Sequence, residues 1–136
     1  MLADKEITER VIGAAITVHK TLGPGFLEGI YEEALAAEFD YLGIHYERQK
    51  TVLITYRSMP IGEHRLDFLI EGKVIVELKA IQGIEDIHFA IVRSYLKATN
   101  LQSALLLNFA AMPVTVKRVG REETARTKPI VEISLT

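Results

Sequence analysis

Apolar residues near the start of the chain repeat with the period of an α-helix. The residues that follow this spacing are Ile7, Val11, Ala14, Ala15, Val18 and Leu22. They predict a helix over residues 4–22. A similar pattern predicts a second helix over residues 26–41, after the sharp break at Gly23-Pro24-Gly25 and before Gly43, which is well placed to end it.

After Gly43 the pattern changes to short β-rich segments. The strands expected from it are residues 45–56, 62–70, 73–80 and 103–109. A third helix is expected over residues 86–99, with Asp86 as its cap. Weaker patterns at 114–119 and 130–135 predict two further short strands. The order α, α, β, β, β, α, β indicates an α/β fold in which three consecutive strands form an antiparallel meander and helices pack on the sheet.

The composition narrows the class of protein. A chain of 136 residues, 49% of them apolar, fits a single domain over residues 1–136. The absence of cysteine excludes a disulfide scaffold, a thiolate zinc site and a cysteine nucleophile, and it suits the reducing cytoplasm. No apolar run approaches the roughly 20 residues that span a bilayer. We therefore expect a cytoplasmic protein with no membrane partner.

The formal net charge is −2. A protein that coats nucleic acid through bulk electrostatics is usually basic, so this charge argues against such a coat. An enzyme remains compatible with it, because an acidic metal site lowers the net charge and the bound ion offsets that charge.

Two consecutive expected strands carry the candidate chemistry. Since alternate residues of a strand share a face, residues 66, 68 and 70 are expected on one face with 74, 76, 78 and 80. The opposite faces then hold Asp67 in the first strand and Glu77 and Lys79 in the second. Carboxylates and lysine are seldom buried among such apolar neighbours unless they are paired or bind a metal.

The length of the connection between these strands decides whether the charged groups meet. A two-residue turn would place Asp67 opposite Val76, with Asp67 and Glu77 on different faces. A connection of three residues, 71–73, places Asp67 opposite Glu77 and Leu66 opposite Leu78, so that the apolar faces also agree. We therefore expect the three-residue register.

Two carboxylates side by side repel each other, and an oxygen-preferring divalent ion such as Mg²⁺ or Mn²⁺ removes that repulsion. Lys79 would then orient water or stabilise charge on a phosphate. The alternative is a structural salt-bridge patch in which Arg65 and Lys79 neutralise Asp67 and Glu77. The short pattern D-x(9)-E-x-K leaves both interpretations open.

More of the sequence resembles a known family. Arg65-Leu66-Asp67 and Val76-Glu77-Leu78-Lys79 resemble the active-site strands of the PD-(D/E)xK nuclease superfamily. The segment from Gly25 through Glu28 to Tyr31 resembles the signature of its GxxExxY family. The resemblance covers residues 7–119. It implies a restriction-endonuclease-like core, which is a mixed β-sheet flanked by helices in the order α-β-β-β-α-β, with an extra N-terminal helix.

By this resemblance, Asp67, Glu77 and Glu28 would be metal ligands, Glu28 directly or through water, and Lys79 would be the catalytic lysine. The cofactor would be Mg²⁺ or Mn²⁺ and the substrate a DNA or RNA phosphodiester. From their positions, Tyr31 and His19 are expected as accessory residues, and the resemblance implies the same role for Tyr95. As alternatives, the helix dipole favours Glu28 at the start of one helix and His19 at the end of another, and Tyr31 packs in the core.

One position departs from the pattern. Related nucleases often carry a glutamine four residues before the tyrosine of the helix after the ExK strand, whereas this chain has Ile91 four residues before Tyr95. An apolar side chain does not form the hydrogen bonds of an amide. The leading hypothesis is a metal-dependent nuclease. The alternative is a catalytically weak or inactive nuclease-fold module that binds nucleic acid or a protein partner. A homodimer is compatible with either.

Overall fold

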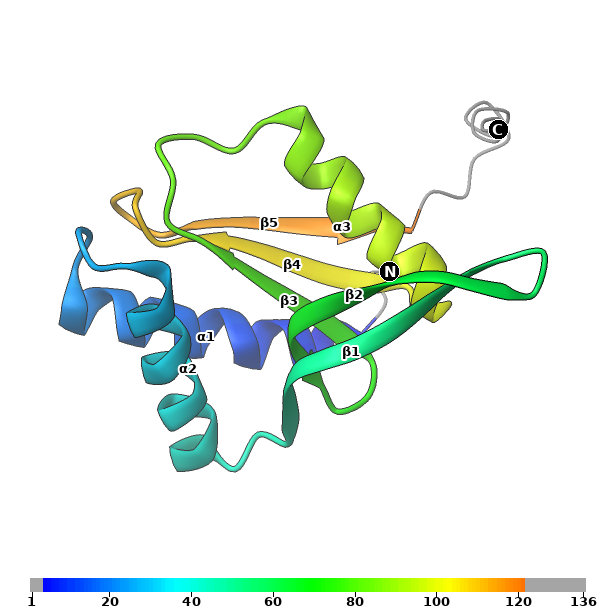
Figure 1. The fold of residues 1–136 in the computed structure, drawn as a ribbon. Helices are drawn as coiled ribbons and strands as arrows, with labels where there is room; N and C mark the ends of the chain where they lie inside the picture. The colour runs from blue at the N-terminus through cyan, green and yellow to red at the C-terminus, as the bar shows by residue number, and fades with distance from the viewer. Residues whose placement is uncertain (1–3, 122–136) are drawn as a thin grey trace.

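The computed structural model describes residues 4–121, so the strand expected over residues 130–135 lies outside the described part. Within that part, the helices are α1 (Lys5–Leu22), α2 (Glu28–Leu42) and α3 (Asp86–Thr99). The strands are β1 (Tyr46–Tyr56), β2 (Met59–Ile70), β3 (Val74–Lys79), β4 (Ser103–Asn108) and β5 (Thr115–Gly120). Figure 1 shows their arrangement. The order and type of the elements predicted over residues 4–119 are confirmed.

The strands form one sheet in the order β1-β2-β3-β4-β5. The first three are antiparallel neighbours, as predicted. The crossover through α3 makes β4 parallel to β3, and β5 returns antiparallel to β4. A parallel pair needs such a crossover, whereas antiparallel strands can be joined by a tight turn. The mixed sheet flanked by helices agrees with the restriction-endonuclease-like core that the resemblance implied.

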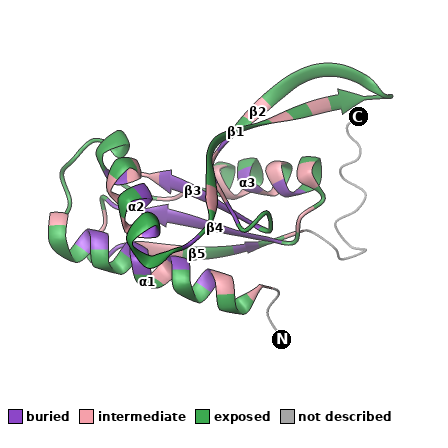
Figure 2. Cartoon of the chain, turned by 90° about the horizontal axis from the view of Figure 1, so that it is seen from below, coloured by how far each residue is buried: buried purple, intermediate pink, exposed green. Residues whose placement is uncertain are grey.

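The two faces of the sheet bury separate hydrophobic clusters. One cluster joins α1 and α2 to the sheet through residues such as Val11, Leu35, Phe68 and Leu105. The other joins α3 to the opposite face through Val92, Leu96, Ile75, Leu106 and Leu66. Figure 1 shows α3 on one side of the sheet and α1 on the other, and Figure 2 shows that β3 and β4 are the buried centre. Side chains that point from the middle of β3 to either face are therefore removed from water.

Helix ends follow local chemistry. Gly23 has a φ of 71°, and its N–H donates to the carbonyl oxygen of His19 as α1 ends. Gly43 adopts the left-handed conformation with a φ of 72° and ends α2, as predicted. The cap of α3 differs from the prediction. The N-cap is Glu85, whose N–H donates to Nδ1 of His88 at 2.8 Å, and Asp86 is the first helical residue.

The turn between β1 and β2 also differs from the prediction, which left residues 57–61 outside the strands. Arg57 and Ser58 have φ values of 51° and 66° and form a two-residue turn, so β2 begins at Met59. Such turns usually carry Asn-Gly or Asp-Gly, and Arg-Ser therefore gives little signal in a sequence. The outer part of β1 and β2 extends as a ribbon beyond the rest of the sheet (Figure 2).

No helix within residues 4–121 combines the length and the apolar character that crossing a membrane requires.

Candidate active site

The pairing of β2 with β3 brings the two strand carboxylates together. Ile70 pairs with Val74, and the ladder continues to the pair of Phe68 with Val76. The connection therefore has three residues, 71–73, and the N–H of Lys73 donates to the carbonyl oxygen of Ile70 at 2.8 Å. The next position in this register sets Asp67 opposite Glu77. The three-residue register is confirmed.

Beyond the pair of Phe68 with Val76, backbone N–H groups of β2 and β3 donate hydrogen bonds to side-chain carboxylates instead of to the carbonyl oxygens of the other strand. The N–H of Asp67 donates to Oε1 of Glu77 at 2.9 Å. The N–H of Leu78 donates to Oδ2 of Asp67, also at 2.9 Å. Each carboxylate thus accepts a hydrogen bond from the strand that carries the other. These two bonds fix the carboxylates beside each other where β2 and β3 separate.

Because β2 and β3 separate here, the predicted position of Leu66 is wrong. Leu66 was expected on the face of Phe68 and opposite Leu78. It is instead buried in the cluster under α3, whereas Phe68 and Leu78 lie in the cluster under α1 and α2. The strict alternation of strand faces fails here because the β2–β3 ladder has ended, and β2 no longer follows the pleat set by β3.

Burial dominates the electrostatics of the carboxylate pair. Glu77 is only 6% exposed. Burial, followed by repulsion from Asp67, raises the pKa of Glu77 to about 8. Burial also raises the pKa of Asp67, while the hydrogen bond from Leu78 opposes the rise. The sequence argument expected the two carboxylates to repel each other. Desolvation is the larger cause of both pKa shifts, and the repulsion that raises the pKa of Asp67 comes from Glu32.

Lys79 ends β3 next to this pair. Its positive charge opposes the rise in the pKa values of Glu28, Asp67 and Glu77, each of which is raised mainly by desolvation. Within residues 4–121, neither Arg65 nor Lys79 forms an ion pair with Asp67 or Glu77. The structure therefore gives no support to the salt-bridge patch that the sequence left open.

Asn108, which the sequence argument assigned no role, holds the chain after Lys79. It is 2% exposed and pairs with Lys79 across β3 and β4. Its Nδ2 donates to the carbonyl oxygen of Ile81 at 2.9 Å, and its Oδ1 accepts from the N–H of Ile81 at 3.1 Å. The N–H of Phe109 donates to the carbonyl oxygen of Lys79 at 2.9 Å. A polar residue at the end of an otherwise apolar strand was the available signal.

Glu28 is the first residue of α2 and lies at the border of the site. The residue as a whole is exposed, but its carboxyl group loses part of its hydration. This desolvation, followed by repulsion from Asp67, raises its pKa. The start of α2 thus lies within electrostatic reach of Asp67, and the role of Glu28 as a metal ligand stays a prediction.

Tyr31 and His19 support the loop that leads to Glu28. Tyr31 is fully buried and stacks on Phe109 with ring centroids 4.7 Å apart. Its hydroxyl donates to the carbonyl oxygen of Gly23 at 2.6 Å and accepts from the N–H of Phe26 at 3.2 Å. Nε2 of His19 lies 3.1 Å from the carbonyl oxygen of Phe109. Both residues thus have structural partners in the loop and the core.

Tyr95 approaches the pair from α3. Burial, followed by repulsion from Glu77 and Asp67, raises the pKa of Tyr95 to about 12, which keeps its hydroxyl protonated. Its ring makes an edge contact with His64, with centroids 4.4 Å apart. Ile91 lies on the same helix and is 39% exposed.

Gln49, in β1, was missed by the sequence argument. Its Nε2 lies 3.2 and 3.1 Å from the two carboxylate oxygens of Glu32 and 3.3 Å from Oδ1 of Asp67. Arg48 also binds Glu32, with an ion pair of 3.0 Å. Gln49 belongs to a polar stretch of an exposed strand, and no motif in the sequence distinguishes it.

The donor set fits a hard divalent cation. Buried carboxylates whose pKa values are raised gain from a cation that replaces the proton. Within residues 4–121, no group of three or more acidic, histidine or cysteine side chains is placed to hold a metal ion. The structure thus brings the carboxylates of Asp67 and Glu77 together, but it does not place Glu28 close enough to form a three-ligand group with them. Mg²⁺ commonly uses one or two carboxylates and retains several waters.

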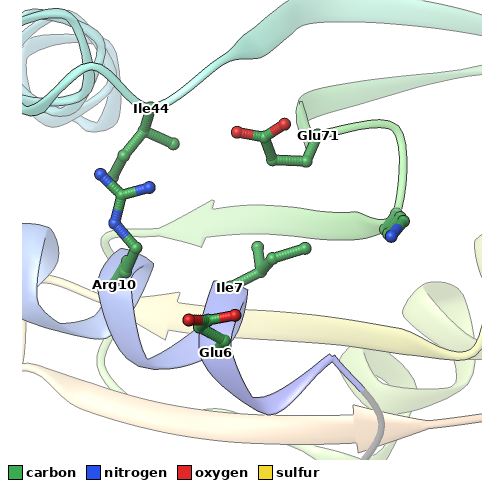
Figure 3. A pocket seen from close by; sticks show the side chains of 6 residues that line it. Glu6, Ile7, Arg10, Ile44 and Glu71 are labelled. Atoms are coloured by element: carbon green, nitrogen blue, oxygen red, sulfur yellow. The ribbon is translucent and has the colours of Figure 1, made fainter.

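A cavity of about 440 Å³ lies elsewhere in the fold. It is lined by α1, the segment before β1, and the turn between β2 and β3 (Figure 3). Its charged residues are Glu6, Arg10, Glu71 and Lys73. It therefore lies at the start of β3, whereas Glu77 and Lys79 lie at its end.

Comparison with known proteins agrees with this fold. The family model of the PD-(D/E)XK nuclease superfamily matches residues 5–119. Among solved structures, the chain is similar to the crystal structure of SSO0001, with a TM-score of 0.55 and 14% sequence identity over 73% of this chain and 52% of that chain. It spans about half the length of that protein, and the similarity concerns the fold. A comparison with curated proteins finds no match. Because the family model covers most of the residues, the chain belongs to the PD-(D/E)XK nuclease superfamily.

Proposed function

We propose that this domain is a Mg²⁺- or Mn²⁺-dependent nuclease that hydrolyses phosphodiester bonds in DNA or RNA. The observation that carries the proposal is the pairing of the half-buried Asp67 with the buried Glu77 beside Lys79. Within residues 4–121, Lys79 forms no ion pair. The finer assignment to the GxxExxY family, based on Gly25, Glu28 and Tyr31, is part of the same proposal.

In this proposal, Asp67 and Glu77 hold the ion, and Glu28 interacts with it through water. When bound, a divalent ion supplies polarisation of the phosphate and lowers the pKa of a coordinated water. Ion binding requires Glu77 to lose its proton, because its pKa in the metal-free protein is about 8. Metal affinity should consequently rise with pH.

Lys79 supplies a positive charge for the phosphate oxygens on which negative charge develops. An ammonium group committed to an ion pair would be less available for this task. Tyr95, with a pKa of about 12, stays protonated and can donate a hydrogen bond at neutral pH. These roles need no basic surface beyond the site, which accommodates the acidic net charge of the chain.

The second candidate is a nuclease-fold module that binds nucleic acid without cleaving it. The specific observation in its favour is Ile91, an apolar and partly exposed side chain on the helix that carries Tyr95. Loss of the amide at this position would weaken the handling of the substrate while leaving the fold intact.

The deciding experiment incubates the purified protein with end-labelled single- and double-stranded DNA and RNA in Mn²⁺, Mg²⁺ or a chelator. The proposal predicts cleavage in metal, none in chelator, and none by Lys79→Ala at equal protein concentration. Binding without cleavage by the wild type in every metal would favour the second candidate. Equal cleavage by wild type and Lys79→Ala would contradict the proposed site.

A further inference from the structure

Gln49 occupies a special place in the row of residues that crosses the site. On either side of it, Arg48 pairs with Phe68 and Lys50 pairs with Leu66. The same register sets Gln49 opposite Asp67, and Asp67 is in turn opposite Glu77. Gln49, Asp67 and Glu77 therefore form one row across β1, β2 and β3.

The backbone of Gln49 is strained in this row. Its φ is 51°, in the left-handed region that a side chain with a Cβ seldom adopts. Glycine would adopt it freely, so the chain retains a glutamine where the backbone favours glycine. Strain of this kind in a native structure is a reason to look for a function of the side chain.

The amide of Gln49 bridges two carboxylates from different elements. Its Nε2 lies within 3.3 Å of Oδ1 of Asp67 and within 3.2 Å of both oxygens of Glu32 in α2. Oδ2 of Asp67 accepts from the N–H of Leu78. Asp67 is thus held at both oxygen atoms, once by β3 and once by Gln49. Two hydrogen bonds to the two oxygens fix the plane of a carboxylate.

We infer that Gln49 is a positioning residue that orients the carboxylate of Asp67 toward the ion and ties it to Glu32. This inference rests on the proposed function. It supplies the site with an amide from β1, whereas α3 has Ile91 at the position where related nucleases often carry a glutamine. Groups that hydrogen-bond to a metal ligand typically change metal affinity or activity by about 10- to 100-fold when they are removed.

The test compares Gln49→Ala with Gln49→Gly in the full chain. Both remove the amide, but glycine also relieves the left-handed backbone, so Gln49→Gly should melt at the higher temperature of the two. If Gln49 positions Asp67, both variants should lose about tenfold or more in Mn²⁺ affinity measured by calorimetry. Wild-type affinity in Gln49→Gly would overturn the inference, because the residue would then matter only for backbone stability.

A second measurement does not depend on metal. In the metal-free protein, the amide resonance of Leu78 reports on its hydrogen bond to Asp67. It should shift in Gln49→Ala and Gln49→Gly. It should stay unchanged in the control Ser58→Gly, which relieves a left-handed φ of 66° in the distant turn. An unchanged Leu78 resonance would overturn the inference. Absence of Mn²⁺ binding by the wild type would instead contradict the proposed function, and the Leu78 shift would still decide the role of Gln49.

Discussion

The two ends of β3 both gather acidic and basic side chains, yet their surroundings differ. At the start of the strand, the cavity of Figure 3 is lined by Glu6, Arg10, Glu71 and Lys73, all of them exposed. At the end of the strand, Glu77 is buried and the pKa of its carboxyl group is raised to about 8.

The hydrogen bonds at the two ends differ in the same way. Near the cavity, Oε2 of Glu71 accepts a long bond of 3.4 Å from the N–H of His45, and Arg10 donates to the carbonyl oxygen of Leu42. At the other end, the carboxylates of Asp67 and Glu77 accept bonds of 2.9 Å from the strands themselves. Charged residues alone thus do not distinguish a site. Burial and fixed orientation do, and the cavity supplies matched controls for the lysine and carboxylate variants.

The largest expected effect is on cleavage by the lysine variants. Lys79→Ala should reduce kcat by about 100-fold or more, the loss typical when a group that stabilises developing charge is removed. Lys73→Ala, at the cavity, should leave kcat near that of the wild type. Lys79→Arg keeps the charge but has a different shape and hardly deprotonates, and we expect it not to restore cleavage. Comparable losses in Lys79→Ala and Lys73→Ala would erase the distinction between the two ends.

The next effect concerns stabilisation by metal. An ion that binds only the folded state adds about 2.7 kcal/mol of stability at 100 times its Kd. Mn²⁺ should therefore raise the Tm of the wild type and of Glu71→Gln, but not that of Asp67→Asn or Glu77→Gln. Differential scanning fluorimetry with and without Mn²⁺ measures this. A full metal response in Glu77→Gln would locate the ion elsewhere.

Stability of the metal-free protein should depend on pH in a defined direction. The pKa of Glu77 is raised from 4.5 to about 8 on folding. The folded state therefore binds more protons than the unfolded state between these values, and stability falls as pH rises from about 5 to 8. Urea unfolding at several pH values in chelator measures this slope. Glu77→Gln should flatten it and be more stable than wild type at pH 8, whereas Glu71→Gln should retain it.

The smallest expected effect is on the loop that leads to Glu28. Tyr31→Phe keeps the ring on Phe109 but removes the hydroxyl that binds Gly23 and Phe26. Each lost hydrogen bond should lower the free energy of unfolding by about 1 kcal/mol. Chemical denaturation measures the change. A loss near zero would mean that water replaces the hydroxyl and that the loop does not depend on it.

Much of this fold could be predicted from the sequence because most of its elements are determined by local sequence patterns. The 3.6-residue period of α1, the glycines that end α1 and α2, and the apolar run of β4 each depend on near neighbours. The register of β2 and β3 was also predictable, because matching apolar residues restricted the connection to three residues. Asp67 and Glu77 could be paired for this reason.

Gln49 could not be predicted in this way. The tight turn at Arg57-Ser58 pairs Tyr56 with Met59, but a bulge between Ile54 and Thr55 shifts the register by one residue. Counting back from the turn without that bulge would set Asp67 opposite Arg48. The exposed strand β1 has no apolar alternation strong enough to correct the count. The face on which Leu66 lies was mispredicted for a related reason. The point at which the β2–β3 ladder ends depends on tertiary packing, which the local sequence pattern does not encode.

The central claim is that a divalent ion binds at Asp67 and Glu77 rather than at the other charged end of β3. Substoichiometric Mn²⁺ added to isotope-labelled protein tests it directly, because the paramagnetic ion broadens the resonances of nearby amides. The account predicts that the amide signals of Asp67 and Leu78 disappear first while those of Glu71 and Lys73 persist. Selective broadening at Glu71 and Lys73, or none at Asp67 and Leu78 at saturating Mn²⁺, would contradict it.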